Sequence, residues 1–249
     1  MIKKIKIPLA KPDVGLSEKK EVLSSFKTNW LTQGPKVKKF ENEMAKVCKS
    51  KYAVAVSNGT VALDIAYKTA GICPGDEVIV PAMTYFSTAS MVSYQKAKPV
   101  FVDIKESDFN IDPKKIEKAI TKKTKAISFI DYGGNPGDLE EIIKIGKKYD
   151  LKVIQDGAQS LGAQYHGKPM GANTLISTMS FHMAKIISTV EGGMVFTSSK
   201  KLKEEIVMRR SHGEKKPGDY EHNLLGTNAR MTDIQASVGL AQLKKLKNF

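Results

Sequence analysis

The chain has 249 residues, of which 41% are hydrophobic and 27% are charged, a composition that is ordinary for a globular protein. It contains no apolar run long enough for a signal peptide or a membrane span. Its two cysteines, Cys48 and Cys73, make neither a disulfide framework nor a metal-ligand cluster. These features predict a cytoplasmic protein that has no membrane partner and no bound metal.

The formal net charge of +14 raises the question of a nucleic-acid partner. Among the 40 Lys and Arg residues the only arginines are Arg209, Arg210 and Arg230, whereas proteins that bind a phosphate backbone usually use arginine forks. The lysines are spread along the chain, and many adjoin glutamates, as in KKLKEE. A solvated, lysine-rich surface is therefore the favoured interpretation, with a nucleic-acid site or an anionic small substrate as alternatives.

Short β-branched runs alternate with longer amphipathic stretches along the chain. The predicted strands are 52–58, 76–82, 98–104, 125–131, 151–156, 176–182 and 192–198. Several of them are apolar throughout, which is the pattern of strands covered on both faces. The predicted helices between them are 60–71, 86–97, 113–120 and 138–150, and the third begins with the favourable cap arrangement of Asp112 and Pro113.

Strands that alternate with helices indicate βαβ units. We therefore predict an α/β fold with a mostly parallel seven-stranded sheet and helices on both faces. The last two strands follow each other closely, so that end of the sheet is expected to depart from the parallel pattern. The segment 229–249 predicts a long helix that runs almost to the last residue without a glycine stop, which suggests that a further segment follows.

Four predicted strand ends carry groups suited to a ligand, and ligands of parallel sheets bind at this edge. After the first strand, Asn58, Gly59 and Thr60 open a helix whose unpaired N–H groups could hold a phosphate. An ordinary helix N-cap is the alternative. After the second strand, Tyr85 could lie flat against a planar ligand or be a half-buried core aromatic.

The third and fourth strand ends carry charged groups. Asp156 ends a strongly apolar strand and requires a partner, because an unpaired buried charge is very costly. A protonated ring nitrogen would be such a partner, Gln159 could reach the same site, and a turn cap is the alternative role of Asp156. After the sixth strand, Ser180 and Lys185 flank a turn in which the lysine could form a Schiff base, although most lysines are solvated surface charges.

The order of these groups favours the functional interpretations over the alternatives. A phosphate cup is followed by an aromatic ring, a carboxylate and a lysine, which is the set that pyridoxal phosphate requires. The cup would hold the phosphate and the aromatic would stack on the ring. The carboxylate would keep the pyridine nitrogen protonated, and the lysine would hold the aldehyde as an imine.

With these groups in this order, the chain resembles the pyridoxal-phosphate-dependent nucleotide-sugar aminotransferases of the DegT/DnrJ/StrS type. The resemblance covers nearly the whole chain. It is carried, in order, by WLTQGPKVKKFENEMA, SNGTVALDIA, PGDEVIVPAMTY, PVFVDI, VIQDGAQSLGAQYHGKPMG, SFHMAK with EGGMV, RRSHG and GTNARMTDIQASVGLAQL. Each motif alone is weak, but the ordered set is highly specific.

The resemblance implies a type I aminotransferase fold in which Lys185 forms the Schiff base and Asp156 contacts the pyridine nitrogen. Members of the family are typically homodimers, and Asn228 would reach the phosphate of the neighbouring subunit's cofactor. The other implied cofactor contacts are Tyr85 and Gln159 with the ring, and Gly59, Thr60 and Ser180 with the phosphate.

The implied reaction moves an amino group from glutamate, or from glutamine, to a keto-sugar linked to a nucleoside diphosphate. Lys185 would carry the proton between the cofactor and the substrate carbon. A related class removes a sugar hydroxyl and has histidine at the lysine position, so Lys185 favours transamination. The TQGP, ITKKTKAI and VEGGMV segments are most similar to the branch that acts at C4 of a 4-keto-6-deoxy hexose in amino-sugar and polysaccharide biosynthesis. Val190 stands where glycine is common, which is expected to stiffen the turn behind the lysine.

Residues 1–249 are expected to form the cofactor-binding large domain, with an N-terminal arm at about 1–35. Family members continue into a smaller C-terminal domain that closes over the active site, so the resemblance implies a chain truncated before it. Two other functions stay open. One is a catalytically incomplete fragment that binds pyridoxal phosphate, and the less favoured one is a basic module that binds nucleic acid.

Overall fold

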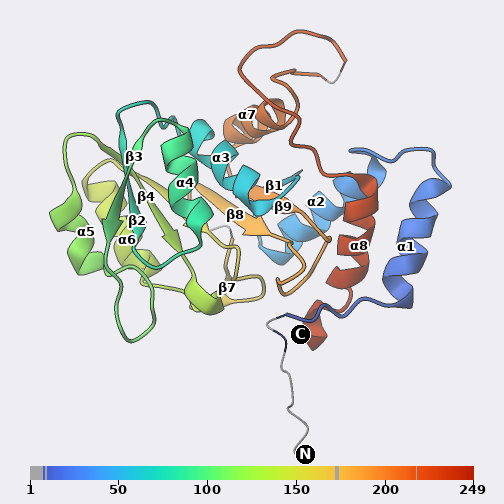
Figure 1. Ribbon diagram of the computed structural model, residues 1–249, viewed down its shortest axis with the longest axis horizontal. Coiled ribbons are helices and arrows are strands. Elements are labelled where there is room, and N and C mark those ends of the chain that lie inside the picture. The colour runs from blue at the N-terminus through green and yellow to red at the C-terminus, as the bar shows by residue number, and fades with distance from the viewer. Residues whose placement is uncertain (1–7, 9, 172–173, 217) are drawn as a thin grey trace, which may run out of the picture.

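The computed structural model describes residues 8, 10–171, 174–216 and 218–249, and a seven-stranded sheet forms its centre (Figure 1). The strand order is β1-β9-β8-β5-β4-β2-β3. The strands of this sheet are β1 (Tyr52–Val56), β2 (Glu77–Pro81), β3 (Lys98–Val102), β4 (Thr124–Ile130), β5 (Lys152–Asp156), β8 (Ile176–Ser180) and β9 (Gly193–Thr197). A separate hairpin consists of β6 (Gln164–Tyr165) and β7 (Lys168–Pro169).

The sheet is mostly parallel, as predicted. The pairs β3–β2, β2–β4, β4–β5 and β5–β8 are parallel, whereas β9 is antiparallel to both β8 and β1. The departure is at the end of the sheet where the sequence predicts it. The segment between β8 and β9 contains no described helix, and a connection without a crossover returns the chain in the antiparallel direction.

Helices cover both faces of the sheet, which confirms the predicted layers (Figure 1). One face is covered by α3 (Gly59–Thr69), α4 (Phe86–Tyr94) and α7 (Lys200–Arg210), and the other by α2 (Pro35–Val47), α5 (Pro113–Ala119) and α6 (Leu139–Lys148). Outside α2, α8 (Asp233–Leu243) packs between α2 and α1 (Leu16–Phe26). The short 3-10 helices are η1 (Tyr132–Gly134) and η2 (Leu246–Asn248).

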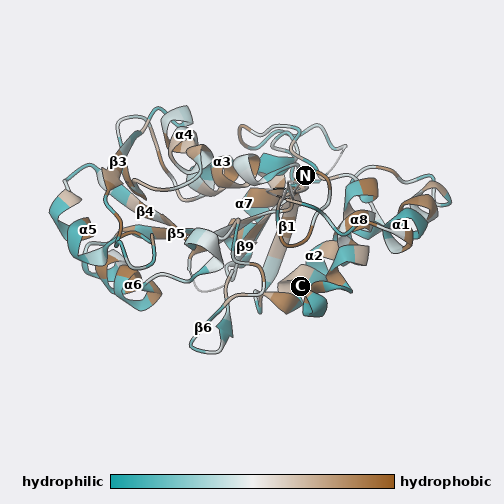
Figure 2. Cartoon of the chain, turned by 60° about the horizontal axis from the view of Figure 1, so that its bottom comes forward, coloured by the Kyte–Doolittle hydropathy of each residue, from teal (hydrophilic) through white to brown (hydrophobic). Residues whose placement is uncertain are grey.

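The core consists of apolar side chains from the sheet and the inner faces of these helices. All five residues of β2 and of β9 are buried, as expected for strands covered on both sides. On α6, Leu139, Ile142 and Ile145 are buried at helical spacing, and Figure 2 shows hydrophobic and hydrophilic residues together on this helix. None of the described helices is both long and apolar enough to cross a membrane.

The predicted helix over 229–249 is wrong at both ends. It begins four residues later, at Asp233, because Thr232 and Gln235 form a capping box. The Thr232 hydroxyl accepts from the Gln235 backbone N–H (3.1 Å), and the side-chain Oε1 of Gln235 accepts from the Thr232 backbone N–H (2.9 Å). Before the cap, Arg230 pairs with Val56 as extended chain. The helix ends at Leu243, and η2 follows it. The sequence also left α1, α2 and α7 unpredicted.

One buried carboxylate links the start of α8 to the start of α2, which are far apart in the sequence. Asp233, at the start of α8, accepts hydrogen bonds from the backbone N–H groups of Gly34 (2.7 Å), Lys36 (3.1 Å) and Val37 (3.0 Å). These groups belong to the first turn of α2, whose N–H groups have no partner within the helix. The beginning of α2 is therefore capped from α8 rather than by its own N-cap residue, Gly34.

Candidate active site

A cavity of about 630 Å³ lies at the carboxyl ends of the parallel strands and at the N-terminus of α3. Its volume is within the range of about 300–1,000 Å³ that is usual for small-molecule sites. Seven of the eight residues predicted from the sequence line it, namely Gly59, Thr60, Tyr85, Asp156, Gln159, Ser180 and Lys185. The fold thus brings together groups that are far apart in the chain.

The N-terminus of α3 forms one end of the cavity. Asn58 is the N-cap and accepts from the Val61 N–H at 2.9 Å, so the alternative of an ordinary cap describes Asn58 correctly. Gly59 and Thr60 in the first turn line the open space beside it. A Cβ on Gly59 would lie 2.8 Å from the Cβ of Ser180, so glycine lets the end of β8 approach the helix. Helix N–H groups and two hydroxyls here suit a phosphate.

Asp156 is the buried last residue of β5, on the floor of the cavity. Its carboxylate accepts from the Thr88 hydroxyl (2.8 Å) and from the Ala158 N–H (3.1 Å). The second bond is a turn contact, as the alternative predicts, but the first comes from α4. Burial raises the pKa of Asp156, and the hydrogen bonds and the charge of Lys185 oppose this rise. A cation bound in the cavity would offset the remaining cost of the buried charge.

Lys185 lies half-buried in the loop between β8 and β9. Burial lowers its pKa, and the negative charge of Asp156 acts in the opposite direction. Lys115 and Lys148 differ, because hydrogen bonds to carboxylates raise their pKa values. Lys185 therefore has the partial burial and the neighbouring acid that distinguish a reactive amine from a solvated surface lysine.

The loop that carries Lys185 is closed by backbone hydrogen bonds. The N–H of Phe181 donates to Gly192 (2.8 Å), the N–H of Thr189 donates to Phe181 (2.9 Å), and the N–H of Lys185 donates to His182 (2.8 Å). Val190 has φ = 72°, a left-handed conformation that is costly for a β-branched residue. The stiff turn expected from Val190 is thus a strained one.

Tyr85 and Gln159, which precede and follow Asp156 in the sequence, both line the cavity. Tyr85 is 69% exposed, so the alternative of a half-buried core aromatic is wrong, and its ring is free to contact a ligand. The side-chain oxygen of Gln159 accepts from the Gly133 N–H at 2.7 Å, which holds this side chain against η1. Both remain candidates for ring contacts.

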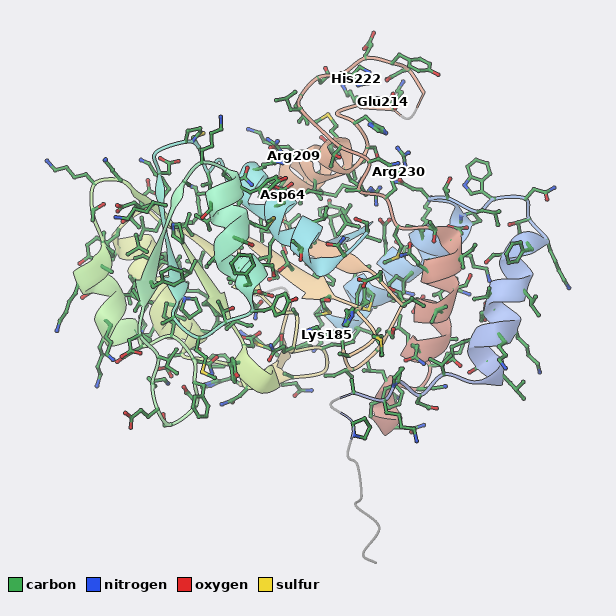
Figure 3. The ribbon with its side chains drawn as sticks, viewed as in Figure 1. Asp64, Lys185, Arg209, Glu214, His222 and Arg230 are labelled. Atoms are coloured by element: carbon green, nitrogen blue, oxygen red, sulfur yellow. The ribbon has the colours of Figure 1, made fainter. Side chains whose placement is uncertain are left out.

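Asn228 is the one predicted residue that does not line this cavity. It is exposed and pairs with Ser211 in an isolated bridge beyond α7. Figure 3 shows Arg230, two residues further along, well separated from Lys185. The predicted contact of Asn228 with a neighbouring subunit's cofactor stays a prediction.

The sequence missed a second buried acid next to Asp156. Asp131 directly follows β4, is fully buried and accepts from the Gln155 amide at 2.7 Å. Burial, with a further contribution from the charge of Asp156, raises the pKa of Asp131 to about 7. The rule that identified Asp156, an acid at the end of an apolar strand, applies equally to Asp131. His182 and Glu191, which also line the cavity, were missed as well.

The cavity as a whole can bind a planar, phosphorylated, positively charged ring. The helix N-terminus offers N–H donors at one end, a carboxylate lies on the floor, and an amine with a lowered pKa is available for covalent bonding. No group of three or more potential metal ligands occurs within the ranges that the structure covers.

Comparisons with known proteins agree with this geometry. A model of the DegT/DnrJ/EryC1/StrS aminotransferase family matches residues 12–249. GDP-perosamine synthase from Escherichia coli O157:H7 is 40% identical over 244 residues, which cover 98% of this chain and 67% of the synthase. The aminotransferase PseC from Helicobacter pylori, involved in the biosynthesis of pseudoaminic acid, has a TM-score of 0.94 at 34% identity, covering 98% of this chain and 67% of PseC.

A third relative is named for a different reaction. A GDP-4-keto-6-deoxymannose-3-dehydratase with a trapped PLP-glutamate geminal diamine has a TM-score of 0.91 at 31% identity, covering 98% of this chain and 69% of that one. The chain spans about two thirds of the length of the curated relatives it matches. By sequence and by fold, this chain belongs to the DegT/DnrJ/EryC1/StrS aminotransferase family.

Proposed function

We propose that this protein is a pyridoxal-phosphate-dependent aminotransferase that moves an amino group from glutamate or glutamine to a nucleotide-linked keto-sugar. The observation that carries the proposal is the convergence of Lys185, Asp156 and the N-terminus of α3 on one cavity. Membership of the family and the sugar-aminating relatives support it.

The residues fit this cofactor. Lys185 would bond its aldehyde carbon, and Asp156 would pair with its ring nitrogen. When bound, pyridoxal phosphate supplies an electron sink for the bond changes at the substrate carbon. The lowered pKa of Lys185 increases the fraction of neutral amine, which is the form that can bond to carbon and accept a proton. The remaining proposed contacts are Gly59, Thr60 and Ser180 with the phosphate, and Tyr85 and Gln159 with the ring.

The proposed acceptor is a 4-keto-6-deoxy hexose linked to a nucleoside diphosphate, used for amino-sugar and polysaccharide biosynthesis. The names of a GDP-perosamine synthase and of a spore coat polysaccharide biosynthesis protein among the relatives support this class. Lys185 favours transamination over the dehydration named for one structural relative.

We further propose that residues 1–249 act as the cofactor-binding large domain and that its N-terminal arm at about 1–35 includes α1. The active form is a cytoplasmic homodimer in which Asn228 reaches the cofactor of the partner. The exposure of Asn228 outside its own cavity supports this arrangement.

The proposal is tested by trapping the bond to Lys185. The protein is purified with pyridoxal phosphate, reduced with borohydride, digested, and mapped by mass spectrometry. We expect a single adduct on Lys185 that is absent in Lys185→Ala and present in Lys144→Ala, an exposed lysine on α6. Labelling scattered over surface lysines would overturn the proposal.

A half-reaction distinguishes the complete enzyme from a fragment that only binds the cofactor. Glutamate added to the loaded protein should shift the absorbance of the cofactor as the amino group is transferred. An adduct on Lys185 without this shift would identify a catalytically incomplete fragment.

One feature of the structure supports the alternative function, a basic module that binds nucleic acid. A groove along α2 is lined by five lysines, which are Lys38, Lys39, Lys46, Lys49 and Lys51. No aromatic residue lines it, and bound single strands usually stack on such residues. Salt-dependent binding of labelled DNA at physiological ionic strength would be needed to favour this function.

A further inference from the structure

Two cavity residues that have no assigned role flank the turn of Lys185. The imidazole Nε2 of His182 lies 3.8 Å from a carboxylate oxygen of Glu191, and both side chains line the cavity with Lys185. We propose that His182 and Glu191 form a subsite that binds a hydroxyl group of the acceptor sugar. The inference rests on the proposed function and deepens it, because it assigns residues of this chain to substrate selection.

The hydrogen bonds of His182 define what its outer nitrogen can do. The Ala184 N–H donates to His182 Nδ1 at 3.3 Å, so Nδ1 acts as an acceptor. An uncharged imidazole with an accepting Nδ1 carries its proton on Nε2. The nitrogen that lies near Glu191 is therefore a hydrogen-bond donor, and the ionised carboxylate of Glu191 is an acceptor.

The separation of these two groups leaves both free to bond a ligand. A distance of 3.8 Å is too long for a direct hydrogen bond, which requires about 2.7–3.2 Å. A hydroxyl oxygen that lies to one side of the pair, within hydrogen-bond reach of both atoms, can accept from His182 and donate to Glu191, because a hydroxyl has both capacities. Two adjacent hydroxyls of one sugar ring can occupy the same pair.

The negative charge of Glu191 determines which part of the proposed substrates can bind at the subsite. The carboxylates of the amino donor and the diphosphate of a nucleotide sugar are anionic, and the carboxylate of Glu191 repels them. A neutral group with both a donor and an acceptor fits better. The sugar ring is the part of the proposed substrates with this chemistry.

The backbone fixes the pair beside the reactive amine. The carbonyl of Glu191 accepts from Thr189 Oγ1 and from Gln235 Nε2, both at 2.8 Å. The carbonyl of His182 accepts from the Lys185 N–H at 2.8 Å. A sugar held by the pair would therefore lie in the same cavity as Lys185.

A purely structural ion pair explains these side chains less well. The side chains of His182 and Glu191 are 46% and 56% exposed, and pairs this exposed contribute little to stability. The backbone bonds between Phe181 and Gly192 and between Thr189 and Phe181 already close the loop. The loop does not require the pair.

The test uses variants that separate the two nitrogens of His182. His182→Asn keeps a polar atom near the Nδ1 position and removes the outer donor, whereas His182→Gln keeps an N–H near the Nε2 position. Glu191→Ala removes the acceptor. His166→Asn is the matched control, because His166 is exposed, does not line the cavity and has φ = 48°, which asparagine tolerates.

The probe is GDP-4-keto-6-deoxymannose. Its Kd is measured by calorimetry for the protein loaded with pyridoxal phosphate, which has no amino group to transfer to it, and the rate of each half-reaction is measured beside it. We expect His182→Asn and Glu191→Ala to raise this Kd about tenfold, the loss typical of one hydrogen bond to a ligand. The change in the glutamate half-reaction should be much smaller. His182→Gln should recover most of the affinity, and His166→Asn should match the wild type.

Combining His182→Asn with Glu191→Ala should weaken binding by much less than the product of the two single effects, because both residues hold the same group. Equal losses in the glutamate and sugar half-reactions would mean a structural role and overturn the inference. If the variants left the Kd of the probe unchanged, the subsite would be overturned and the proposed function would stand. A wild-type protein that reacts with glutamate but binds no probe would overturn the proposed sugar acceptor and this subsite with it.

Discussion

The two walls of the cavity are built differently. The sheet wall is built on Asp156, which lines the cavity and is hydrogen-bonded to Thr88 and Asp131. All three are buried groups at strand ends and on α4. The loop wall, residues 181–192, has several exposed side chains, is closed by backbone hydrogen bonds, and includes a residue in a strained conformation. The difference indicates a division of roles. In the proposed function, the group that sets the charge of the ligand is fixed by the core, whereas the group that forms and releases a covalent bond lies on a loop.

The largest expected effect comes from the sheet wall. Asp156→Asn keeps the shape of the side chain but removes the charge that we propose to pair with the ring nitrogen. The rate of the glutamate half-reaction should fall by about 100-fold to 1,000-fold, the size usual for loss of one preorganised electrostatic contact. Rapid-mixing absorbance measures this rate.

Borohydride trapping provides the control for Asp156→Asn, because the adduct on Lys185 should still form. A half-reaction rate near that of the wild type would show that the sheet wall does not set the charge of the ligand.

The next largest effect is on stability, and it tests whether buried acids behind the sheet wall make the stability depend on pH. In the folded state the pKa of Asp131 is raised from 3.8 to about 7. Above about pH 4 the unfolded chain loses this proton while the folded protein keeps it, so Asp131 should lower the free energy of unfolding as the pH rises to about 7. This loss amounts to about 3 kcal/mol and should disappear in Asp131→Asn.

Urea unfolding at several pH values measures this dependence. Asp150→Asn, at an exposed position with φ = 52°, is the matched control. If Asp131→Asn retained the full slope of the wild type between pH 4 and 7, another group would be responsible.

The smallest effect tests the strain in the loop wall. Val190→Gly should raise the free energy of unfolding by about 0.5–1 kcal/mol, because relief of the left-handed conformation exceeds the entropic cost of glycine. Thermal or urea unfolding measures the change. Val14→Gly, at an exposed position outside the helices, should bring no gain. Equal losses in both variants would mean that the loop wall stores no strain.

The seven strands could be predicted because each is a short, mostly apolar run, and most are buried along their length. The edge strand β3 is the exception in burial, since Lys98 and Phe101 are exposed. Helices α3 to α6 followed from the segments between them. The helix α7 was missed because its sequence, KKLKEEIVMRR, is mostly charged and buries only Ile206 and Arg210. The start of α8 was predicted too early because apolar Met231 extends the pattern, although Thr232 and Gln235 carry a capping-box signature.

The sequence could predict those cavity residues whose location follows from their position at the end of a strand. Asp156 and the Gly59 turn follow from that rule, and Asp131 would have followed from the same rule. The contact of Thr88 with Asp156 and that of Gln159 with Gly133 depend on how distant segments pack, which one sequence does not reveal. A contact made by Asn228 in another subunit depends on a second chain and lies beyond both sequence pattern and monomer geometry.

The capping of α2 by Asp233 has a consequence for synthesis on the ribosome. The accepting carboxylate of Asp233 and the N–H group of Gly34 are 199 residues apart in the sequence. Strand β1 lies at the edge of the sheet, and among the described strands its single partner is β9. At about 5–20 residues per second, α2 leaves the ribosome about 10–40 s before its cap is made. For most of that interval β1 and α2 are exposed without their partners, so they are early targets for a chaperone that binds nascent chains.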